Sequence, residues 1–313
     1  MSKVKQFIKN ISPLNNRTDM PAFLYVIKVI LIFWFCKFGS ELIGEAFAIG
    51  IHFACGKNPL EGELFDMETI TLISYYGYAL MIVLILLYWK LFQKKTLAQL
   101  GFTKKFGFYF LGAAIGTVLI AVSIASVMLT GTITYNGIFS SIDYRWIALM
   151  FGGFIFQGAL EEVLCRGIVL SLLKDRVPVP VAIAVSTALF VIPHIGNMAD
   201  AGADIVVFAV AGLILISVIF SLLTLQTKSL WAACGLHTFW NFILCNILGL
   251  NLSGNEGSAA AVFDMRSVGS SVLNGGIYGI EASAVTAVIL SLAAVVFFIA
   301  YRSAKTNKTA LPA

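Results

Sequence analysis

The sequence predicts an all-α fold: a polytopic transmembrane bundle of about eight helices. Of the 313 residues, 59% are hydrophobic and 12% are charged, whereas soluble domains carry roughly 25% charged residues. Several apolar runs reach the ~20 residues that a helix needs to cross a bilayer. Basic and acidic loops alternate strictly between these runs, which is the pattern of loops on opposite sides of a membrane. The net charge of +5 is therefore a topology signal, and we expect the lipid bilayer as a partner but no nucleic acid.

Eight apolar segments account for the number of helices. In order they cover approximately residues 22–54, 70–92, 106–130, 146–172, 179–197, 204–225, 229–250 and 282–301. The stretch from Asn251 to Glu281 is rich in Gly, Ser and Asn and is expected to be a long outer loop. An even number of crossings with basic ends places both termini in the cytoplasm.

These segments divide the chain into three parts. Residues 1–20 form a basic cytoplasmic N-terminus without a small-residue cleavage site, so we expect no removable signal peptide. Residues 21–303 form a single transmembrane domain, and residues 304–313 form a cytoplasmic tail. The compact loops indicate a multi-pass protein of a prokaryotic plasma membrane, with the eukaryotic endoplasmic reticulum as the alternative.

The first apolar segment, 22–54, is too long for one straight span and is interrupted by Lys37, Glu41 and Glu45. Lys37 and Glu41 are spaced to pair along one helical face. We expect either a tilted helix whose outer end follows the membrane interface, or a first half that lies in the interface. Two complete spans are excluded, because they would reverse the alternation of charge downstream.

Ionisable and amide side chains within three spans indicate where the chemistry lies, since charge at bilayer depth is costly and marks functional sites. They are Glu161, Glu162 and Arg166 in the fourth span, His194 in the fifth, and His237 and Asn241 in the seventh. Counted from the cytoplasmic flanks at the rise of a helix, four of them lie roughly 14–27 Å deep. Three helices therefore bring polar groups to one slab near the middle of the membrane.

The spacing of these residues predicts their directions. Glu162 and Arg166 are four residues apart, so the guanidinium can neutralise the second carboxylate. Glu161 is turned about 100° away and faces a different neighbour. His237 and Asn241 are also four apart, and they present an imidazole and an amide on one face.

Proline and glycine residues in the same spans predict how the helices pack. Pro193 is expected to loosen the fifth helix beside His194, because it removes a backbone hydrogen bond. Gly152, Gly153 and Gly158 precede the glutamates and are expected to allow the close approach of a neighbouring helix.

Taken in order, the motifs EExxxR (161–166), FxxxH (190–194) and HxxxN (237–241) resemble the three-motif signature of the CPBP family, the CAAX proteases and bacteriocin-processing (Abi) proteins. The resemblance covers about residues 145–250, which would form the protease core. It implies an intramembrane endopeptidase that hydrolyses peptide bonds near the membrane, in CAAX-type or bacteriocin processing. Its substrate would be a membrane peptide or protein, prenylated or unprenylated.

The resemblance also implies a role for each residue. Glu161 would be the general base that activates water, and His194 would help to hold that water. His237 and Asn241 would donate hydrogen bonds to the oxyanion. Glu162 and Arg166 would orient and charge-balance the site. These residue types suit the roles. A carboxylate in an apolar pocket can act as a general base, and imidazole and amide N–H groups are common oxyanion donors.

Two mechanisms stay open at this point. The first choice needs no cofactor and relies on the glutamate. The alternative is a metalloprotease with a catalytic zinc ion held by His194, His237 and Glu161, the two-His, one-carboxylate set with water as fourth ligand. The sequence contains no HExxH motif that would support this alternative.

Two other classes of function also stay open. A proton-coupled transporter can use the same residue types, because carboxylate and histidine relays occur in transporters. Many transporters consist of two similar halves with interrupted helices, and we find no such symmetry in this sequence. The third possibility is a non-catalytic bacteriocin-immunity or scaffold protein that binds a peptide without cutting it.

Overall fold

The computed structural model describes residues 3–257 and 261–309. Within these residues, seven helices are long and apolar enough to cross a membrane. They are α2 (Ala22–Ala54), α3 (Met67–Leu91), α5 (Gly107–Leu129), α6 with its continuation (Tyr144–Leu173), α8 with its continuation (Val179–Met198), α9 (Ala203–Thr227) and α12 (Ala284–Thr309). The predicted helical bundle is confirmed.

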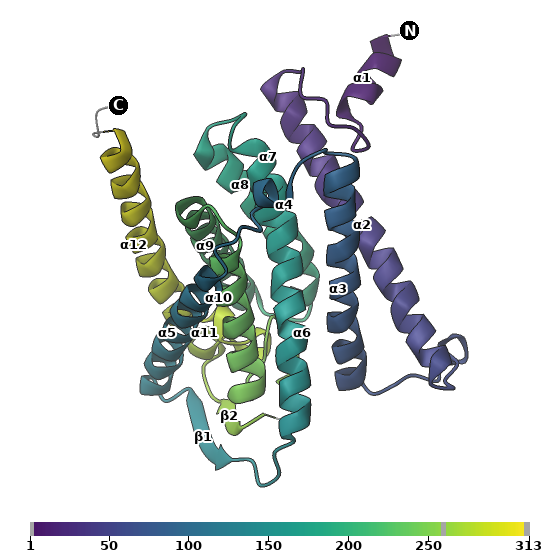
Figure 1. The fold of residues 1–313 in the computed structure, drawn as a ribbon. Helices are drawn as coiled ribbons and strands as arrows, with labels where there is room; N and C mark the ends of the chain where they lie inside the picture. The colour runs from purple at the N-terminus through teal and green to yellow at the C-terminus, as the bar shows by residue number, and fades with distance from the viewer. Residues whose placement is uncertain (1–2, 258–260, 310–313) are drawn as a thin grey trace.

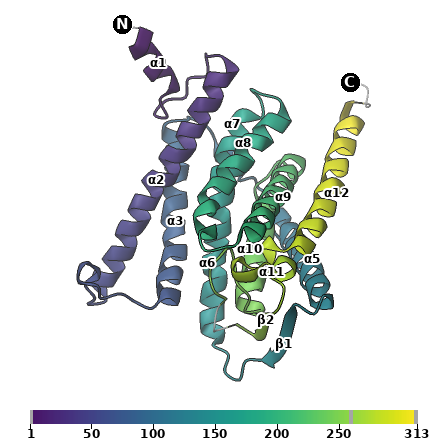
Figure 2. The same cartoon turned by 180° about the vertical axis from the view of Figure 1, so that it is seen from behind.

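The eighth apolar segment forms a shorter helix in the middle of this bundle. It comprises the 12 residues of α10 (Trp231–Phe242) and the 5 residues of η4 (Ile243–Ile247). Helix α10 packs against α5, α6 and α9 (Figure 1). With this helix the chain crosses the bundle eight times, so both ends of the chain lie at the same end of the bundle (Figures 1 and 2).

Short elements precede, continue or connect the long helices. They are α1 (Lys3–Ile11), η1 (Pro59–Glu61), α4 (Leu97–Leu100), β1 (Ile133–Ile138), η2 (Val163–Leu170), α7 (Ser171–Leu173), η3 (Ile192–Met198), β2 (Phe263–Ser267), α11 (Ser271–Asn274), η5 (Gly276–Tyr278) and η6 (Ile280–Ala282). The predicted domain boundary at residue 303 falls inside α12, which continues through Thr309. The remainder of the predicted tail, 310–313, lies outside the described residues.

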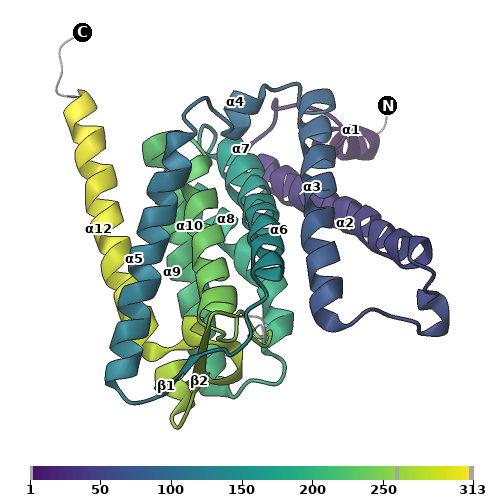
Figure 3. The same cartoon turned by 60° about the horizontal axis from the view of Figure 1, so that its bottom comes forward.

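The first apolar segment is one continuous helix, α2, of 33 residues. It crosses α3 at a steep angle, and its second half diverges from the bundle (Figures 1 and 3). Nearly all of its buried side chains lie between Tyr25 and Ser40. Lys37 and Glu41 form the predicted ion pair. The segment is therefore one continuous helix that is inclined to α3 (Figure 1).

A small antiparallel sheet joins two loops that the sequence did not predict to be extended. In this sheet β1 pairs with β2, with Ile133 opposite Ser267 and Tyr135 opposite Met265. The predicted outer loop 251–281 therefore contains a strand and several short helical turns. The pairing was missed because the two strands are far apart in sequence, and a two-stranded ribbon becomes stable only when it packs on other structure.

Glycine residues allow α10 to pack backbone to backbone with α5. A Cβ atom added at Gly112 would lie 1.9 Å from the carbonyl oxygen of Ala232, and one added at Gly235 would lie 2.0 Å from that of Tyr109. Such distances exclude any side chain at these two positions. The resulting close contact fixes the helix that carries His237 in the centre of the bundle.

The predicted close approach at the glycines of α6 is confirmed. A Cβ atom at Gly158 would lie 3.1 Å from the backbone nitrogen of Thr238, so α6 and α10 touch at this level. Gly152 and Gly153 lie against tyrosine side chains of α3. These contacts set α6, which ends at the two glutamates, between α3 and α10.

Candidate active site

Each of the three site-bearing helices changes its helical form beside a predicted site residue. Helix α6 ends at Glu162 and continues as the π-helix η2, and α10 ends one residue after Asn241 and continues as the π-helix η4. Helix α8 ends at Val191 and becomes the 3₁₀-helix η3, which contains Pro193 and His194. The predicted effect of Pro193 is therefore confirmed. Segments of π-helix occur frequently at functional sites.

A cavity of about 730 Å³ lies between these helices, α3 and α9. Its lining includes four of the predicted residues: Glu161, His194, His237 and Asn241. Tyrosine, tryptophan and phenylalanine side chains form much of the remaining wall, and residues 252–257 with Glu281 line the end that faces the outer loop. Cavities of this size that combine apolar walls with polar groups are typical of ligand-binding sites.

Glu161 is the predicted residue with the largest access to this cavity, with its side chain 27% exposed. Its Oε1 atom accepts a hydrogen bond of 2.7 Å from the Nε2 of Gln157. The Oε1 of Gln157 in turn accepts a bond of 2.9 Å from the Nδ2 of Asn241. Gln157 therefore links the predicted general base to a predicted oxyanion donor. The sequence contained a signal for Gln157, a polar residue in an apolar span one helical turn before Glu161.

The second carboxylate oxygen of Glu161 faces two imidazoles. Its Oε2 atom lies 3.8 Å from the Nε2 of His194 and 3.9 Å from the Nε2 of His237. These separations exceed the length of a hydrogen bond. Oε2 is buried and accepts no hydrogen bond from the described residues. The carboxylate and both imidazoles therefore direct polar atoms at one point beside the cavity.

In each imidazole, the second ring nitrogen, Nδ1, lies at hydrogen-bond distance from a protein oxygen. The Nδ1 of His194 lies 2.8 Å from the carbonyl oxygen of Phe190, and the Nδ1 of His237 lies 3.1 Å from the Oε1 of Glu162. Because a carbonyl oxygen only accepts, Nδ1 of His194 carries the hydrogen, and Nε2 of the neutral ring is an acceptor. Phe190, which the motif pairs with His194, thus positions the imidazole through its backbone.

Glu162 and Arg166 form the predicted ion pair behind the cavity. The Nη1 of Arg166 donates to the Oε1 of Glu162 at 2.9 Å, and both side chains are 0% exposed. The guanidinium also contacts the rings of Phe190 and Phe220, with its central carbon 4.8 and 5.0 Å from their centroids. The pair is therefore enclosed by protein, with cation–π contacts to the guanidinium, and neither residue lines the cavity.

Helix α9 supplies supporting groups that the sequence analysis missed. The Nη2 of Arg166 donates to the carbonyl oxygen of Ser217 at 2.9 Å and to its Oγ at 2.6 Å. Phe220 stacks on His237, with ring centroids 5.0 Å apart. Serine and phenylalanine are ordinary residues of an apolar span, so no local signal distinguished them.

Glu281 holds the outer end of the cavity together. Its Oε2 accepts hydrogen bonds from the backbone nitrogen and the Oγ of Ser253, at 2.8 and 3.0 Å, and its Oε1 accepts one of 3.2 Å from the indole of Trp240. Its enclosure raises the pKa of the Glu281 carboxyl, and these hydrogen bonds oppose the rise. The sequence showed Glu281 at the start of the last span but did not reveal its partners.

The same geometry bears on the metal alternative. Within the described residues, no group of three or more His, Cys, Asp or Glu side chains could hold a metal ion. Ligands about 2.0–2.1 Å from a tetrahedral zinc lie roughly 3.4 Å apart, whereas Oε2 of Glu161 lies 3.8 and 3.9 Å from the two imidazole nitrogens. Its Oε1 is bonded to Gln157. These donors do not fit a zinc site as they lie, and we derive no catalytic step through a metal.

Residues 143–243, about a third of the chain, match the model of a protein family described as type II CAAX prenyl endopeptidase Rce1-like. The predicted family resemblance is confirmed. The matched stretch extends from the first residue before α6 to the first residue of η4 and contains all six predicted site residues. Neither the curated proteins nor the solved structures include a significant match to the chain.

The family match and the apolar helices agree on the general class of protein. Seven candidate spans make it a multi-pass membrane protein. The match supports an intramembrane endopeptidase of the CAAX type, with a membrane-associated peptide as substrate.

Proposed function

We propose that the protein cleaves peptide bonds of membrane-anchored peptides or proteins, with Glu161 as the general base and without a metal ion. One observation carries the proposal: the buried Oε2 of Glu161 lies beside the Nε2 atoms of His194 and His237, at the edge of the cavity. A carboxylate and an imidazole at this separation suit the binding of one water molecule between them.

The proposed first step is the attack of that water on the substrate. The water donates one hydrogen bond to Oε2 of Glu161 and the other to Nε2 of His194, so its lone pairs are free to attack the carbonyl carbon. Glu161 takes the proton as the new C–O bond forms, and later transfers it to the nitrogen of the leaving peptide. The bond from Gln157 fixes the carboxylate in the orientation that this transfer requires.

His237 and Asn241 would stabilise the oxyanion of the tetrahedral intermediate. Glu161 and Glu162 bring two negative charges and Arg166 brings one positive charge, so an imidazolium at His237 makes the cluster neutral. Its Nδ1–H then donates to Glu162, and its Nε2–H is directed toward the cavity as an oxyanion donor. The amide of Asn241 carries two hydrogens, of which one bonds Gln157 and the other is a second donor.

The experiment is a cleavage assay on purified, reconstituted protein. A farnesylated CAAX reporter peptide and its unprenylated twin are incubated with wild type, with Glu161→Gln, and with Glu45→Gln as an exposed glutamate on α2 that matches the substitution. We expect Glu161→Gln to lower cleavage by about 10²–10⁴-fold, the range for loss of a general base, and Glu45→Gln to have no effect. Thermal unfolding of both variants checks that they are folded.

The same assay separates the alternatives. Cleavage that persists in Glu161→Gln would refute the assigned role, and cleavage that a chelator abolishes would restore the metal mechanism. The twin peptide reports whether the substrate must be prenylated. Binding of the peptide without cleavage would indicate an immunity or scaffold protein. Proton flux in liposomes that does not depend on the peptide would indicate a transporter.

A further inference from the structure

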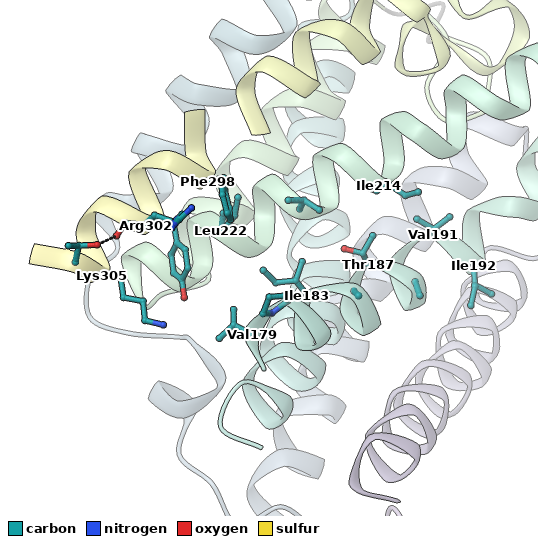
Figure 4. Close-up of a pocket in the computed structure, with 16 residues that line it drawn as sticks. Val179, Ile183, Thr187, Val191, Ile192, Ile214, Leu222, Phe298, Arg302 and Lys305 are labelled. Atoms are coloured by element: carbon teal, nitrogen blue, oxygen red, sulfur yellow. Dashed lines mark hydrogen bonds between the residues drawn. The ribbon is translucent and has the colours of Figure 1, made fainter. Parts of the chain in front are cut away.

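A second cavity, of about 980 Å³, lies on the outer surface of the bundle between α8, α9 and α12 (Figure 4). We call it the lateral groove. Its walls include Ile183 and Val191 of α8, Ile214 and Leu222 of α9, and Phe298 of α12. None of its lining residues is among the predicted catalytic residues. The groove is therefore separate from the candidate active site.

The groove exists because α12 is poorly covered by protein. Only 11% of the most apolar window of α12 is buried, the lowest value among the seven candidate spans of the described chain. Helix α12 packs on α9 and α5, and its C-terminal half stands apart from α8 (Figures 1 and 2). In a membrane, the space that this leaves is accessible to lipid.

The charge of the lateral groove is confined to one end. Arg302 and Lys305 are exposed and lie on one face of α12, at the same end of the groove as Val179 (Figure 4). The guanidinium carbon of Arg302 lies 5.8 Å from the ring centroid of Phe298, a wall residue, so the cation is held at the rim. This is the end of the bundle where both ends of the chain lie.

The length of the groove suits one lipid chain. From Val179 to Ile192, α8 and its continuation rise roughly 20 Å. The hydrocarbon layer of one leaflet is roughly 15 Å thick, half of the ~30 Å core. Away from the cationic end, Thr187 is the one polar side chain among the described wall residues. A peptide backbone in such a groove would leave its polar groups without partners, whereas an acyl chain has none to satisfy.

We propose that the lateral groove binds an anionic phospholipid from the leaflet on the side of the two termini. An acyl chain lies along α8 and α9, and the phosphate is bound by Arg302 and Lys305. A guanidinium binds phosphate with two parallel hydrogen bonds, and an ammonium adds a point charge. A neutral lipid would occupy the same groove, but the two cations would add little to its binding free energy.

The groove also borders the network behind the active site. The Oγ1 of Thr187, in the groove wall, accepts a hydrogen bond of 2.9 Å from the Oγ of Ser217, which itself accepts from Arg166. A lipid chain along α8 covers this contact from the membrane side. We therefore expect bound lipid to raise the thermal stability of the bundle. Neither the binding nor this effect requires that the protein be a protease.

Native mass spectrometry of delipidated protein tests the proposal. Phosphatidylglycerol and phosphatidylcholine with identical acyl chains are titrated into wild type, Arg302→Gln/Lys305→Gln, and Lys104→Gln/Lys105→Gln. The last pair removes the same charge from an exposed loop outside the groove. We expect wild type to retain phosphatidylglycerol preferentially. Retention should fall roughly fivefold for each groove cation removed and roughly 30-fold for both, with less than a twofold change in the control pair.

A second variant tests the apolar walls. Ala184→Phe/Ala188→Phe places two rings in the groove from exposed positions of α8 and should abolish retention of both lipids, while thermal unfolding confirms a folded protein. The proposal would be overturned by equal retention of the two lipids in wild type. It would also be overturned by equal losses in the two charge variants, or by retained phosphatidylglycerol when the walls are filled.

Discussion

Glu161 and Glu162 are neighbours in the chain, but their side chains lie in two different environments. Glu161 is 27% exposed to the cavity, and one of its oxygens faces two imidazoles without a hydrogen bond from the described residues. Glu162 is 0% exposed, and its Oε1 is held by Arg166 at 2.9 Å and by His237 at 3.1 Å, while its Oε2 has no hydrogen-bond partner among the described residues. The helical rotation of about 100° between adjacent residues produces this separation.

The difference indicates that two adjacent residues of one short motif have different roles, one structural and one chemical. A buried carboxylate that is neutralised by a cation has its charge satisfied and gains little from taking a proton. A carboxylate without a cation at hydrogen-bond distance, beside a cavity, is free to act as a base. The polar groups near the cavity are therefore expected to affect cleavage, and those behind it to affect folding.

The largest expected effect is the loss of stability in Glu162→Gln. The substitution leaves the fully enclosed guanidinium of Arg166 without its carboxylate, which typically costs about 3–5 kcal/mol when a buried pair is broken. Unfolding in detergent with a chaotrope measures this cost, and Glu161→Gln is the matched comparison with no expected change. Equal unfolding midpoints for the two variants would contradict the division between the two glutamates.

A double variant sharpens the same comparison. Glu162→Leu/Arg166→Leu removes both charges and should recover much of the lost stability, because an apolar pair of similar volume often replaces a buried ion pair at little cost. It also removes the acceptor for Nδ1 of His237. The recovered protein should therefore still cleave poorly, which would assign the pair a role in orienting His237 in addition to its structural one.

Gln157→Leu should give the next largest effect, this time on cleavage. It removes the 2.7 Å bond to Glu161 and the 2.9 Å bond from Asn241. A hydrogen bond to a charged group contributes about 1.5–3 kcal/mol, so kcat should fall roughly 10–100-fold with little change in KM. Gln226→Leu, which removes a bond to the backbone of α12, is the matched control. A fall in both variants alike would indicate a general packing effect.

The depth of the site was predictable from the sequence because three independent helices could be measured from their basic flanks. The count brought Glu161, His194 and His237 to one level, and these residues do surround one cavity. Pro193 also predicted correctly where α8 leaves the α-helical form. Helical rise and proline chemistry are local properties, and a sequence reveals local properties well.

The supporting groups were less predictable because their partners come from other helices. Ser217 is buried on α9 and bonds Arg166, but a serine in an apolar span gives no signal of its own. Glu281 reaches Trp240 and Ser253 only because the outer loop folds back over the cavity. The pairing of β1 with β2 is equally long-range. Such contacts depend on the tertiary path, which the periodicity of a span does not contain.

Ser217→Ala is expected to have a smaller effect, on stability alone. It removes the bond of 2.6 Å from Arg166 to the hydroxyl and the bond of 2.9 Å from the hydroxyl to Thr187, but the carbonyl of Ser217 still accepts from Arg166 at 2.9 Å. The loss should cost about 1.5–3 kcal/mol, and cleavage should stay within a few-fold of wild type. Ser221→Ala, whose bond to Arg166 is 3.4 Å long, should cost less. A larger effect on cleavage than on stability would place this network in the chemistry.

Glu281 is an intermediate case between Glu161 and Glu162, and its substitution is expected to have the smallest effect. Its partners are an amide N–H, a hydroxyl and an indole N–H, and enclosure raises its pKa. The folded protein therefore binds the proton more tightly than the unfolded chain. This contribution to stability is fully present below the ordinary carboxyl pKa and is lost as the pH rises through the raised value.

Glu281→Gln tests this linkage. The variant removes the titration, so its Tm should fall less than that of wild type as the pH rises through the raised pKa of Glu281. In acid, wild type carries a neutral carboxylic acid, which like the amide offers one carbonyl acceptor, so the two Tm values should be close there. Toward neutral pH the Tm of wild type should fall below that of the variant. Parallel profiles would mean that Glu281 keeps one protonation state throughout, as a purely structural group would.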